Sequence, residues 1–334
     1  MENLVSYVLR LESQNKMKQF TSVHDVEDIN ALVQEALELK KNPYAFEHLG
    51  KRKTLGLIFL NPSLRTRLST QKAAQSLGMN VMVMNMGQEG WALETQDGAI
   101  MNGTTVEHIK DAAAVMGEYC DVLGLRSFPK LQNVEEDYSE EILKKFIQYS
   151  NVPFVSLESA TRHPLQSLAD LVTITEHAPQ GRRPKVVLTW GPHVKALPQA
   201  VPNSFAEWMC AADVDFVITH PEGYELDPQF TNGATITHNQ QEALEGADFI
   251  YIKNWSTFQP QYGQVLTQDP SWMLTNQHLA NTNNAKVMHC LPVRRNVELS
   301  DEILDGPNSL VVNEAANREF AAQAVLKQLL EGIQ

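Results

Sequence analysis

Short runs of apolar residues recur along the chain without alternating with polar residues. They are rich in Val, Ile and Leu, as expected of strands that are buried on both faces of a sheet. The predicted strands are 54–60, 81–84, 121–125, 152–156, 185–190, 215–219, 248–253 and 286–289. Apolar positions at helical spacing predict helices over 69–77, 106–118, 202–211 and 314–330. Strands that alternate with helices in this way indicate parallel sheets covered by helices.

The length of 334 residues suits about two domains of roughly 150 residues each. No change in composition marks a linker between them. The stretches 87–105 and 256–276 show no clear period. Long aperiodic loops inside a compact domain are more often functional than accidental, so both are candidates for parts of a site.

The balance of charge and the cysteine content exclude several classes of protein. The net charge of −13 disfavours binding to nucleic acid or to an anionic membrane surface. No apolar run reaches the roughly 20 residues that span a bilayer, and the polar segment Met1–Gln19 does not resemble a signal peptide. Cys120, Cys210 and Cys290 form no CxxC pair, so neither a disulfide framework nor a thiolate zinc site is indicated. We expect a cytoplasmic protein.

The strongest local motif is residues 59–67, FLNPSLRTR, in which a buried strand passes through a proline turn into a helix. Ser63, Arg65 and Thr66 then lie at the helix N-terminus, where free N–H groups and the helix dipole favour an anion. An arginine fork matches a phosphate group. The chain contains no Walker phosphate loop. No GxGxxG motif follows a strand, so a dinucleotide site is not indicated. The alternative is a capped helix with a surface arginine.

A second motif, His163-Pro-Leu-Gln166, opens another helix after a predicted strand. The carboxyl edge of an α/β sheet is where ligands bind. An imidazole and an amide at that edge suit a carbamoyl or carboxamide group. The alternative for His163 is a helix cap.

A third motif, residues 289–295 with the sequence HCLPVRR, follows the last predicted strand. Cys290 could be a nucleophile, but no partner base is indicated, and a buried cysteine is usually inert packing. The backbone carbonyls before Pro292 could instead accept from an amide. Arg126 and Arg318 are further cations, each of which could equally form a structural salt bridge.

Together these motifs resemble the aspartate/ornithine carbamoyltransferase family. The ordered motifs are SLRTR (63–67), HPLQ (163–166), HCLP (289–292) and EAANR (314–318). The resemblance covers nearly the whole chain and implies an α/β fold with two doubly wound parallel-sheet domains. A carbamoyl phosphate-binding domain would span 1–155, joined by the C-terminal helix 312–334, and an acylornithine-binding domain would span 156–311. The resemblance also implies a homotrimer with shared active sites. It implies neither a metal nor a cofactor.

Departures from the family pattern favour its N-acylornithine branch. The Ser-Met-Gly loop of ornithine enzymes is absent from the stretch 248–255, DFIYIKNW, and the loop 87–105 lacks the lysine of aspartate enzymes. Trp91, the run 189–193 (TWGPH), Lys253 and the run 294–296 (RRN) resemble the N-acylornithine pattern. Acylation removes the charge of the α-amine and leaves a carboxylate, for which Lys253, Arg294 and His193 would supply cations.

One residue bears on the acyl group. The related acetylornithine enzymes carry a glutamate where this chain has Val106, before the pair Glu107-His108. A carboxylate about 4 Å from a succinyl carboxylate would cost about 1–4 kcal/mol, so valine favours a succinyl group. The alternative is that Val106 only packs at a helix start.

The resemblance therefore implies transfer of a carbamoyl group from carbamoyl phosphate to the δ-amine of N-succinylornithine, in arginine biosynthesis. The residues expected to act in catalysis are Arg65, Thr66, Arg126, His163 and Gln166. Carbamoyl phosphate would contact these and Ser63, Leu64, Trp91, Cys290, Leu291 and Arg318. The acylornithine would contact Val106, Glu158, His193, Lys253 and Arg294. The alternatives are an N-acetylornithine enzyme, an ornithine enzyme, and a non-catalytic anion-binding protein on the same fold.

Overall fold

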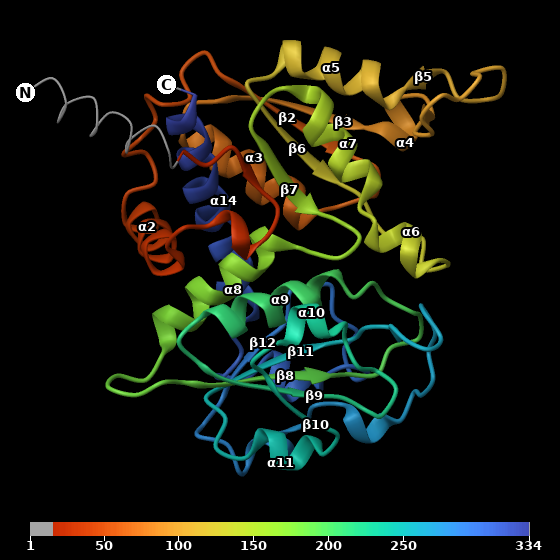
Figure 1. Ribbon diagram of the computed structural model, residues 1–334. Coiled ribbons are helices and arrows are strands. Elements are labelled where there is room, and N and C mark those ends of the chain that lie inside the picture. Colours follow the sequence, from red (N-terminus) through yellow and green to blue (C-terminus); the bar gives the residue numbers. More distant parts are fainter. Residues whose placement is uncertain (1–15, 334) are drawn as a thin grey trace, which may run out of the picture. The chain divides into compact units, whose positions relative to one another are not determined.

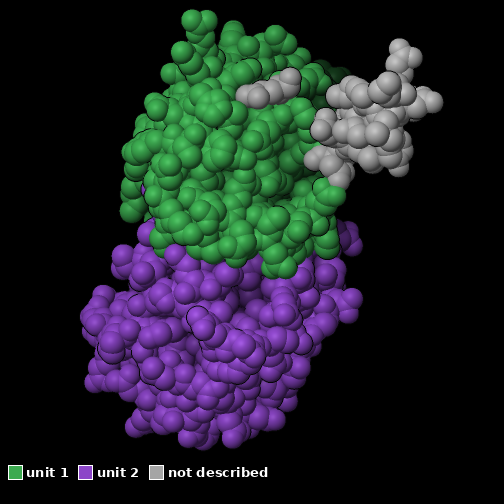
Figure 2. Space-filling view, turned by 90° about the vertical axis from the view of Figure 1, so that its left-hand side faces the viewer, with its two compact units in different colours: residues 1–127, 141–157, 322–334 green, residues 128–140, 158–321 purple. Residues whose placement is uncertain are grey.

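The computed structural model describes residues 16–333 (Figure 1). The chain divides into two compact units, which Figure 2 colours separately. Unit 1 comprises the residues up to Ser127, then Glu141–Leu157, and the chain from Ala322. Unit 2 comprises Phe128–Glu140 and Glu158–Ala321. None of the described helices combines the length and apolarity needed to cross a membrane.

Unit 1 is built on a parallel sheet with the strand order β1-β7-β6-β2-β3. These strands are β1 (Gln19–Phe20), β2 (Thr54–Phe59), β3 (Asn80–Asn85), β6 (Val122–Arg126) and β7 (Phe154–Glu158). Its helices are η1 (Val23–Asp25), α2 (Ile29–Lys41), α3 (Arg65–Ser76), α4 (Met86–Glu89), α5 (Ile109–Tyr119) and α7 (Glu141–Ser150). A small parallel pair, β4 (Leu93–Glu94) and β5 (Glu107–His108), stands apart from the main sheet. Apolar side chains of the central strands and of α5 and α7 form one core cluster, including Ile58, Leu123 and Phe146.

Unit 2 repeats the plan with the parallel order β10-β9-β8-β11-β12. These strands are β8 (Lys185–Trp190), β9 (Asp215–Thr219), β10 (Thr235–Thr237), β11 (Phe249–Lys253) and β12 (Lys286–Met288). Its helices are α6 (Val134–Tyr138), α8 (Pro164–His177), α9 (Ala200–Ala211), α10 (Pro228–Thr231), α11 (Gln240–Leu244), η2 (Pro270–Trp272), α12 (Asn276–Leu279) and α13 (Asp301–Leu304). The core cluster of this unit includes Val187, Ile250 and Val287, one from each of three neighbouring strands.

The predicted α/β class with two parallel-sheet domains is confirmed, and every predicted apolar run overlaps a strand. The predicted helix over 106–118 begins only at Ile109, because residues 107 and 108 pair with β4 instead. The last helix, α14 (Val311–Gly332), passes from unit 2 into unit 1 at Ala322. The sequence prediction had placed both 128–140 and 312–334 in the first domain. The compact units instead put 128–140 and the helix up to Ala321 in unit 2. The very short edge strands β1 and β10 escaped prediction because two or three residues carry no periodicity.

Candidate active site

The start of α3 offers backbone donors beside a buried guanidinium in unit 1. The helix begins at Arg65, and its N-cap Leu64 supplies no side-chain capping bond. Arg126 is the last residue of β6 and pairs with Phe59 of β2. Arg126 therefore lies beside the start of the 59–67 motif. Its Nη1 donates to Oγ1 of the buried Thr66 at 3.3 Å. First-turn N–H groups beside an arginine form an anion site of the kind that holds a phosphate.

Trp91 and Val106, which were predicted separately, lie on one small structure in unit 1. The backbone N of Val106 donates to the Ala92 carbonyl at 3.1 Å, and the Trp91 indole donates to the Glu107 carboxylate at 2.8 Å. Both apolar side chains are exposed, Trp91 by 53% and Val106 by 64%. Val106 therefore does not pack at a helix start, and its side chain is open to solvent in the single chain.

His163 directly precedes α8 in unit 2 and is buried. Its Nε2 lies 3.4 Å from a carboxylate oxygen of Glu158 and 3.5 Å from Nη2 of Arg318. Glu158 and Arg318 are also buried. Both groups approach the same ring nitrogen, which can donate to Glu158 or accept from Arg318 but cannot do both at once, so the tautomer decides which of them orients the ring.

The side chain of Gln166, in the first turn of α8, is fully buried. Its Nε2 donates to Asp170 at 2.8 Å and to Glu314 at 2.9 Å. Two carboxyl partners use both amide hydrogens, which fixes the orientation of the amide. Among the described residues, no hydrogen bond reaches its Oε1, so this oxygen is available to accept from a ligand.

The two carboxyl groups behind Gln166 were missed by the sequence prediction. Burial raises the pKa of Asp170 to about 7. Burial and the neighbouring Asp170 also raise the pKa of Glu314, whose second oxygen accepts from the backbone N of His289 at 2.8 Å. The pair therefore holds a proton near neutral pH. Glu314 belongs to the EAANR motif, and Asp170 lies one helical turn beyond Gln166, but the contact between them depends on the fold.

Cys290 and Leu291 follow β12, and their backbone carbonyls remain open. In the part of the chain that the structure describes, no hydrogen bond reaches either carbonyl oxygen. The backbone N of Leu291 donates to Nδ1 of His289 at 2.9 Å, with Leu291 in the left-handed region at φ 56°. Burial raises the pKa of the Cys290 thiol. This residue therefore offers a carbonyl acceptor rather than a thiolate nucleophile.

Lys253, the last residue of β11, is 8% exposed. Within the described residues, its Nζ makes no hydrogen bond or ion pair. The carboxylate of Glu298 is a nearby charge but makes no direct ion pair with Nζ among the described residues, so this buried ammonium favours an anionic ligand.

Arg294 and His193 form a neighbouring pair. Nε of Arg294 donates to Nε2 of His193 at 3.0 Å, and Nδ1 of the same ring lies 2.9 Å from the Lys195 carbonyl. An arginine can only donate, so Nε2 of His193 is the acceptor in this contact. His193 therefore positions Arg294, and its predicted contact with the substrate carboxylate stays a prediction.

Glu298 is a further residue that the sequence prediction missed. It accepts from the backbone N of Arg294 at 2.7 Å and lies 3.4 Å from Nε2 of His289. Burial alone would raise the pKa of Glu298, but the hydrogen bond from His289 and the nearby charge of Lys253 lower it to about 2. Its spacing of four residues from Arg294 is the only sequence signal for this anchoring role.

The predicted site residues thus fall into two groups. Unit 1 holds Ser63, Leu64, Arg65, Thr66, Trp91, Val106 and Arg126. Unit 2 holds Glu158, His163, Gln166, His193, Lys253, Cys290, Leu291, Arg294 and Arg318.

Comparison with known proteins gives consistent matches along the chain. Residues 18–176 match the model of the aspartate/ornithine carbamoyltransferase carbamoyl-P binding domain, and residues 198–329 match that of the Asp/Orn binding domain. A Bacteroides thetaiotaomicron protein named N-succinylornithine carbamoyltransferase is 55% identical over 95% of this chain and 100% of its own length. A Xanthomonas campestris protein named N-acetylornithine carbamoyltransferase is 34% identical over 94% of this chain and 98% of its own.

A solved structure adds a ligand to the comparison. It is a variant of N-acetyl-L-ornithine transcarbamylase in which a glutamate is replaced by valine, complexed with carbamyl phosphate and N-succinyl-L-norvaline. It is 34% identical to this chain with a TM-score of 0.87, and the match covers 93% of this chain and 99% of the other.

Proposed function

The chain belongs to the aspartate/ornithine carbamoyltransferase family, and we propose that it transfers the carbamoyl group of carbamoyl phosphate to the δ-amine of N-succinyl-L-ornithine. The products are N-succinyl-L-citrulline and phosphate, in cytoplasmic arginine biosynthesis. The observation that carries the choice of acceptor is the 55% identity to a relative named for succinylornithine, against 34% for one named for acetylornithine.

Carbamoyl phosphate is an anion with a neutral carbamoyl end, and the chain offers separate groups for each end. The first-turn N–H groups of α3, with Arg65 and Arg126, bind the phosphate, and Arg318 contributes a further guanidinium. The open Oε1 of Gln166 accepts from the carbamoyl NH₂, together with the carbonyls of Cys290 and Leu291. This division orients the carbamoyl carbon for attack.

The reaction is a direct transfer. The unprotonated δ-amine attacks the carbamoyl carbon, and the bond from this carbon to the phosphate oxygen breaks. Thr66, Arg126 and His163 donate to the carbonyl oxygen as it gains negative charge, which is usually the largest catalytic contribution. The departing phosphate takes the proton that the amine loses. No step requires a covalent intermediate on Cys290.

The acylornithine carboxylate binds at Lys253 and Arg294 in this proposal. Support comes from the buried Nζ of Lys253, which makes no direct ion pair among the described residues, and from the anchoring of Arg294 by His193 and Glu298. Glu158 contributes by orienting His163.

We further propose a homotrimer in which Trp91 and Val106 contact the substrate of a neighbouring subunit. The support is their exposure and their mutual contacts through Ala92 and Glu107. The transcarbamylase variant with valine in place of a glutamate was solved with a succinyl ligand, and we assign that glutamate to the position of Val106.

A steady-state assay with three acceptors tests this function. Purified protein is given carbamoyl phosphate with ornithine, N-acetylornithine or N-succinylornithine, and the citrulline product is quantified by mass spectrometry. The highest kcat/KM is expected with N-succinylornithine. A preference for either other acceptor would overturn the acyl assignment, and no product with any of them would overturn the transfer activity.

A further inference from the structure

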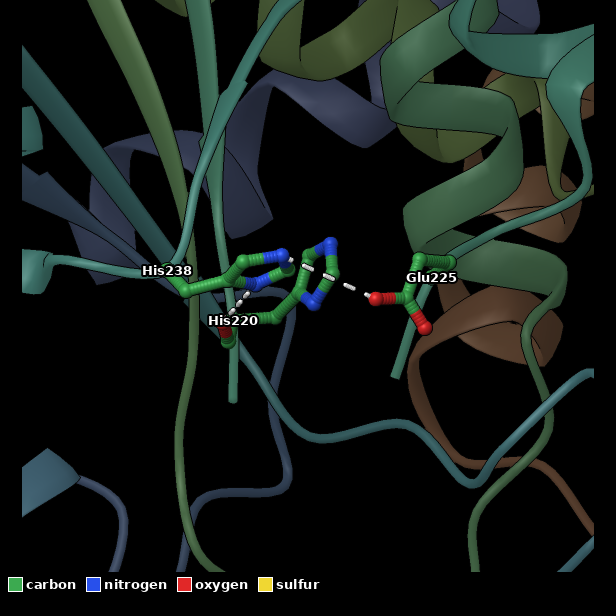
Figure 3. A group of neighbouring side chains, drawn as sticks. All are labelled: His220, Glu225 and His238. Carbon is green, nitrogen blue, oxygen red and sulfur yellow. Dashed lines mark hydrogen bonds and ion pairs between the residues drawn. The ribbon is translucent and has the colours of Figure 1, made fainter. Parts of the chain in front are cut away.

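Three side chains that can bind a metal lie together in unit 2, outside the residues assigned to carbamoyl transfer. His220 follows β9 and His238 follows β10, and the parallel pairing of these strands brings both to the same edge of the sheet. Glu225 comes from the loop after β9, and Figure 3 shows its carboxylate facing the two rings. The three ligand atoms lie within 4.8 Å of one another.

The backbone sets the tautomer of both histidines. Nδ1 of His220 lies 2.9 Å from the Pro221 carbonyl, and Nδ1 of His238 lies 3.0 Å from the His220 carbonyl. A carbonyl oxygen can only accept, so each neutral ring carries its proton on Nδ1 and keeps a lone pair on Nε2. Metal-binding histidines are typically oriented in this way, by donating their other N–H to a carbonyl or carboxylate.

The remaining geometry suits a small cation. Nε2 of His238 lies 3.8 Å from the Glu225 carboxylate, and the two imidazole centroids lie 5.0 Å apart with ring planes at 74°. Bonds to zinc of about 2.0–2.1 Å place tetrahedral donors roughly 3.4 Å apart. The side chains of His238 and Glu225 are about half exposed, at 43% and 50%, and can close the remaining distance by rotating. His220 is buried and provides the fixed point.

We propose that His220, Glu225 and His238 bind one zinc ion, with a fourth position for water. Two imidazoles and a carboxylate are a known donor set for zinc, whereas magnesium and calcium prefer oxygen ligands alone. His238 also lines a cavity of about 480 Å³, through which an ion can enter.

The ion would join the loop after β9 to the ends of both strands. That loop is already attached to the segment after β11, because the Trp255 indole donates to the Tyr224 carbonyl at 2.8 Å. The ring of His220 also packs against Trp255, with centroids 6.1 Å apart. Zinc at this site therefore stabilises the segment between His220 and Glu225.

Metal titration of the full chain tests the proposal. Protein treated with a chelator and dialysed is titrated with Zn²⁺ by calorimetry, and with Co²⁺ by visible absorption. We expect one ion per chain, tetrahedral cobalt bands and a higher Tm with zinc. His238→Ala and Glu225→Gln should each weaken zinc binding at least tenfold, since even residues that only orient a ligand change affinity by about 10- to 100-fold.

Matched controls distinguish this site from adventitious binding. His177→Ala removes another exposed imidazole, and Cys210→Ser removes a partly accessible thiol, and both should bind zinc like the wild type. Absence of stoichiometric binding, unchanged binding in both ligand variants, or loss in Cys210→Ser alone would overturn the proposal. Should His238→Ala fail to fold by circular dichroism, the exposed Glu225→Gln decides the outcome.

Discussion

The replacement Val106→Glu is expected to shift acceptor preference from N-succinylornithine towards N-acetylornithine. Val106 is 64% exposed and is held beside Trp91 by the contacts of Ala92 and Glu107. A glutamate here can extend into solvent or towards a neighbouring subunit without disturbing the core of its own unit. The new carboxylate would meet the succinyl carboxylate, while an acetyl group carries no charge to repel.

The size of the effect depends on how far the position is desolvated. Two like charges about 4 Å apart repel by about 1 kcal/mol in water and by about 4 kcal/mol in a partly buried site. The exposure of Val106 within one chain favours the lower figure, and coverage by a second subunit favours the higher one. In kcat/KM for succinylornithine, this range corresponds to a decrease between about fivefold and several hundredfold.

The assay compares wild type, Val106→Glu and the uncharged, equally sized Val106→Gln with both acylornithines at low and high salt. Only the glutamate variant should lose succinylornithine activity, and added salt should reduce the loss. Equal losses in the glutamate and glutamine variants would show that size, not charge, is responsible. Unchanged succinylornithine kinetics in a folded Val106→Glu protein would refute the placement of this residue at the acyl end.

Three other predictions test unit 2. Lys253→Met should raise KM for succinylornithine about 30-fold or more, since loss of one partner of a buried charge pair costs about 2–5 kcal/mol, and an unchanged KM would contradict the carboxylate site. Cys290→Ser should keep activity within about tenfold of wild type, because the buried thiol has a raised pKa and only its backbone carbonyl is used; a trapped covalent carbamoyl-enzyme would contradict direct transfer. The native pKa of Asp170, about 7, exceeds the unfolded value of about 4, so the native state retains a proton and the free energy of unfolding falls as pH rises between these values, by up to about 1.4 kcal/mol per pH unit. Urea unfolding of Asp170→Asn from pH 4 to 7 should show a shallower dependence than wild type, and parallel curves would contradict the shared proton.

Several structural contacts have no counterpart in any sequence motif. Glu314 reaches Gln166 across 148 positions of sequence, and Arg294 reaches His193 across 101. Burial then decides the chemistry of Glu314, because the same carboxyl group would behave ordinarily in water. The positioning role of His193 likewise comes from its contact with Arg294, which no local pattern predicts.

The amino-acid sequence by itself determined the α/β class, the parallel strands and the ordered motifs that define the family. Buried strands are recognisable locally because both of their faces pack against apolar layers, which gives continuous apolar runs. A motif such as 59–67 includes a strand end, a turn and a helix start within a few residues. Only the tertiary structure decided that Val106 is exposed beside Trp91, that two carboxyl groups orient the amide of Gln166, and that His220 and His238 meet. Such contacts join residues whose separation along the chain bears no relation to their distance in space, so local patterns cannot encode them.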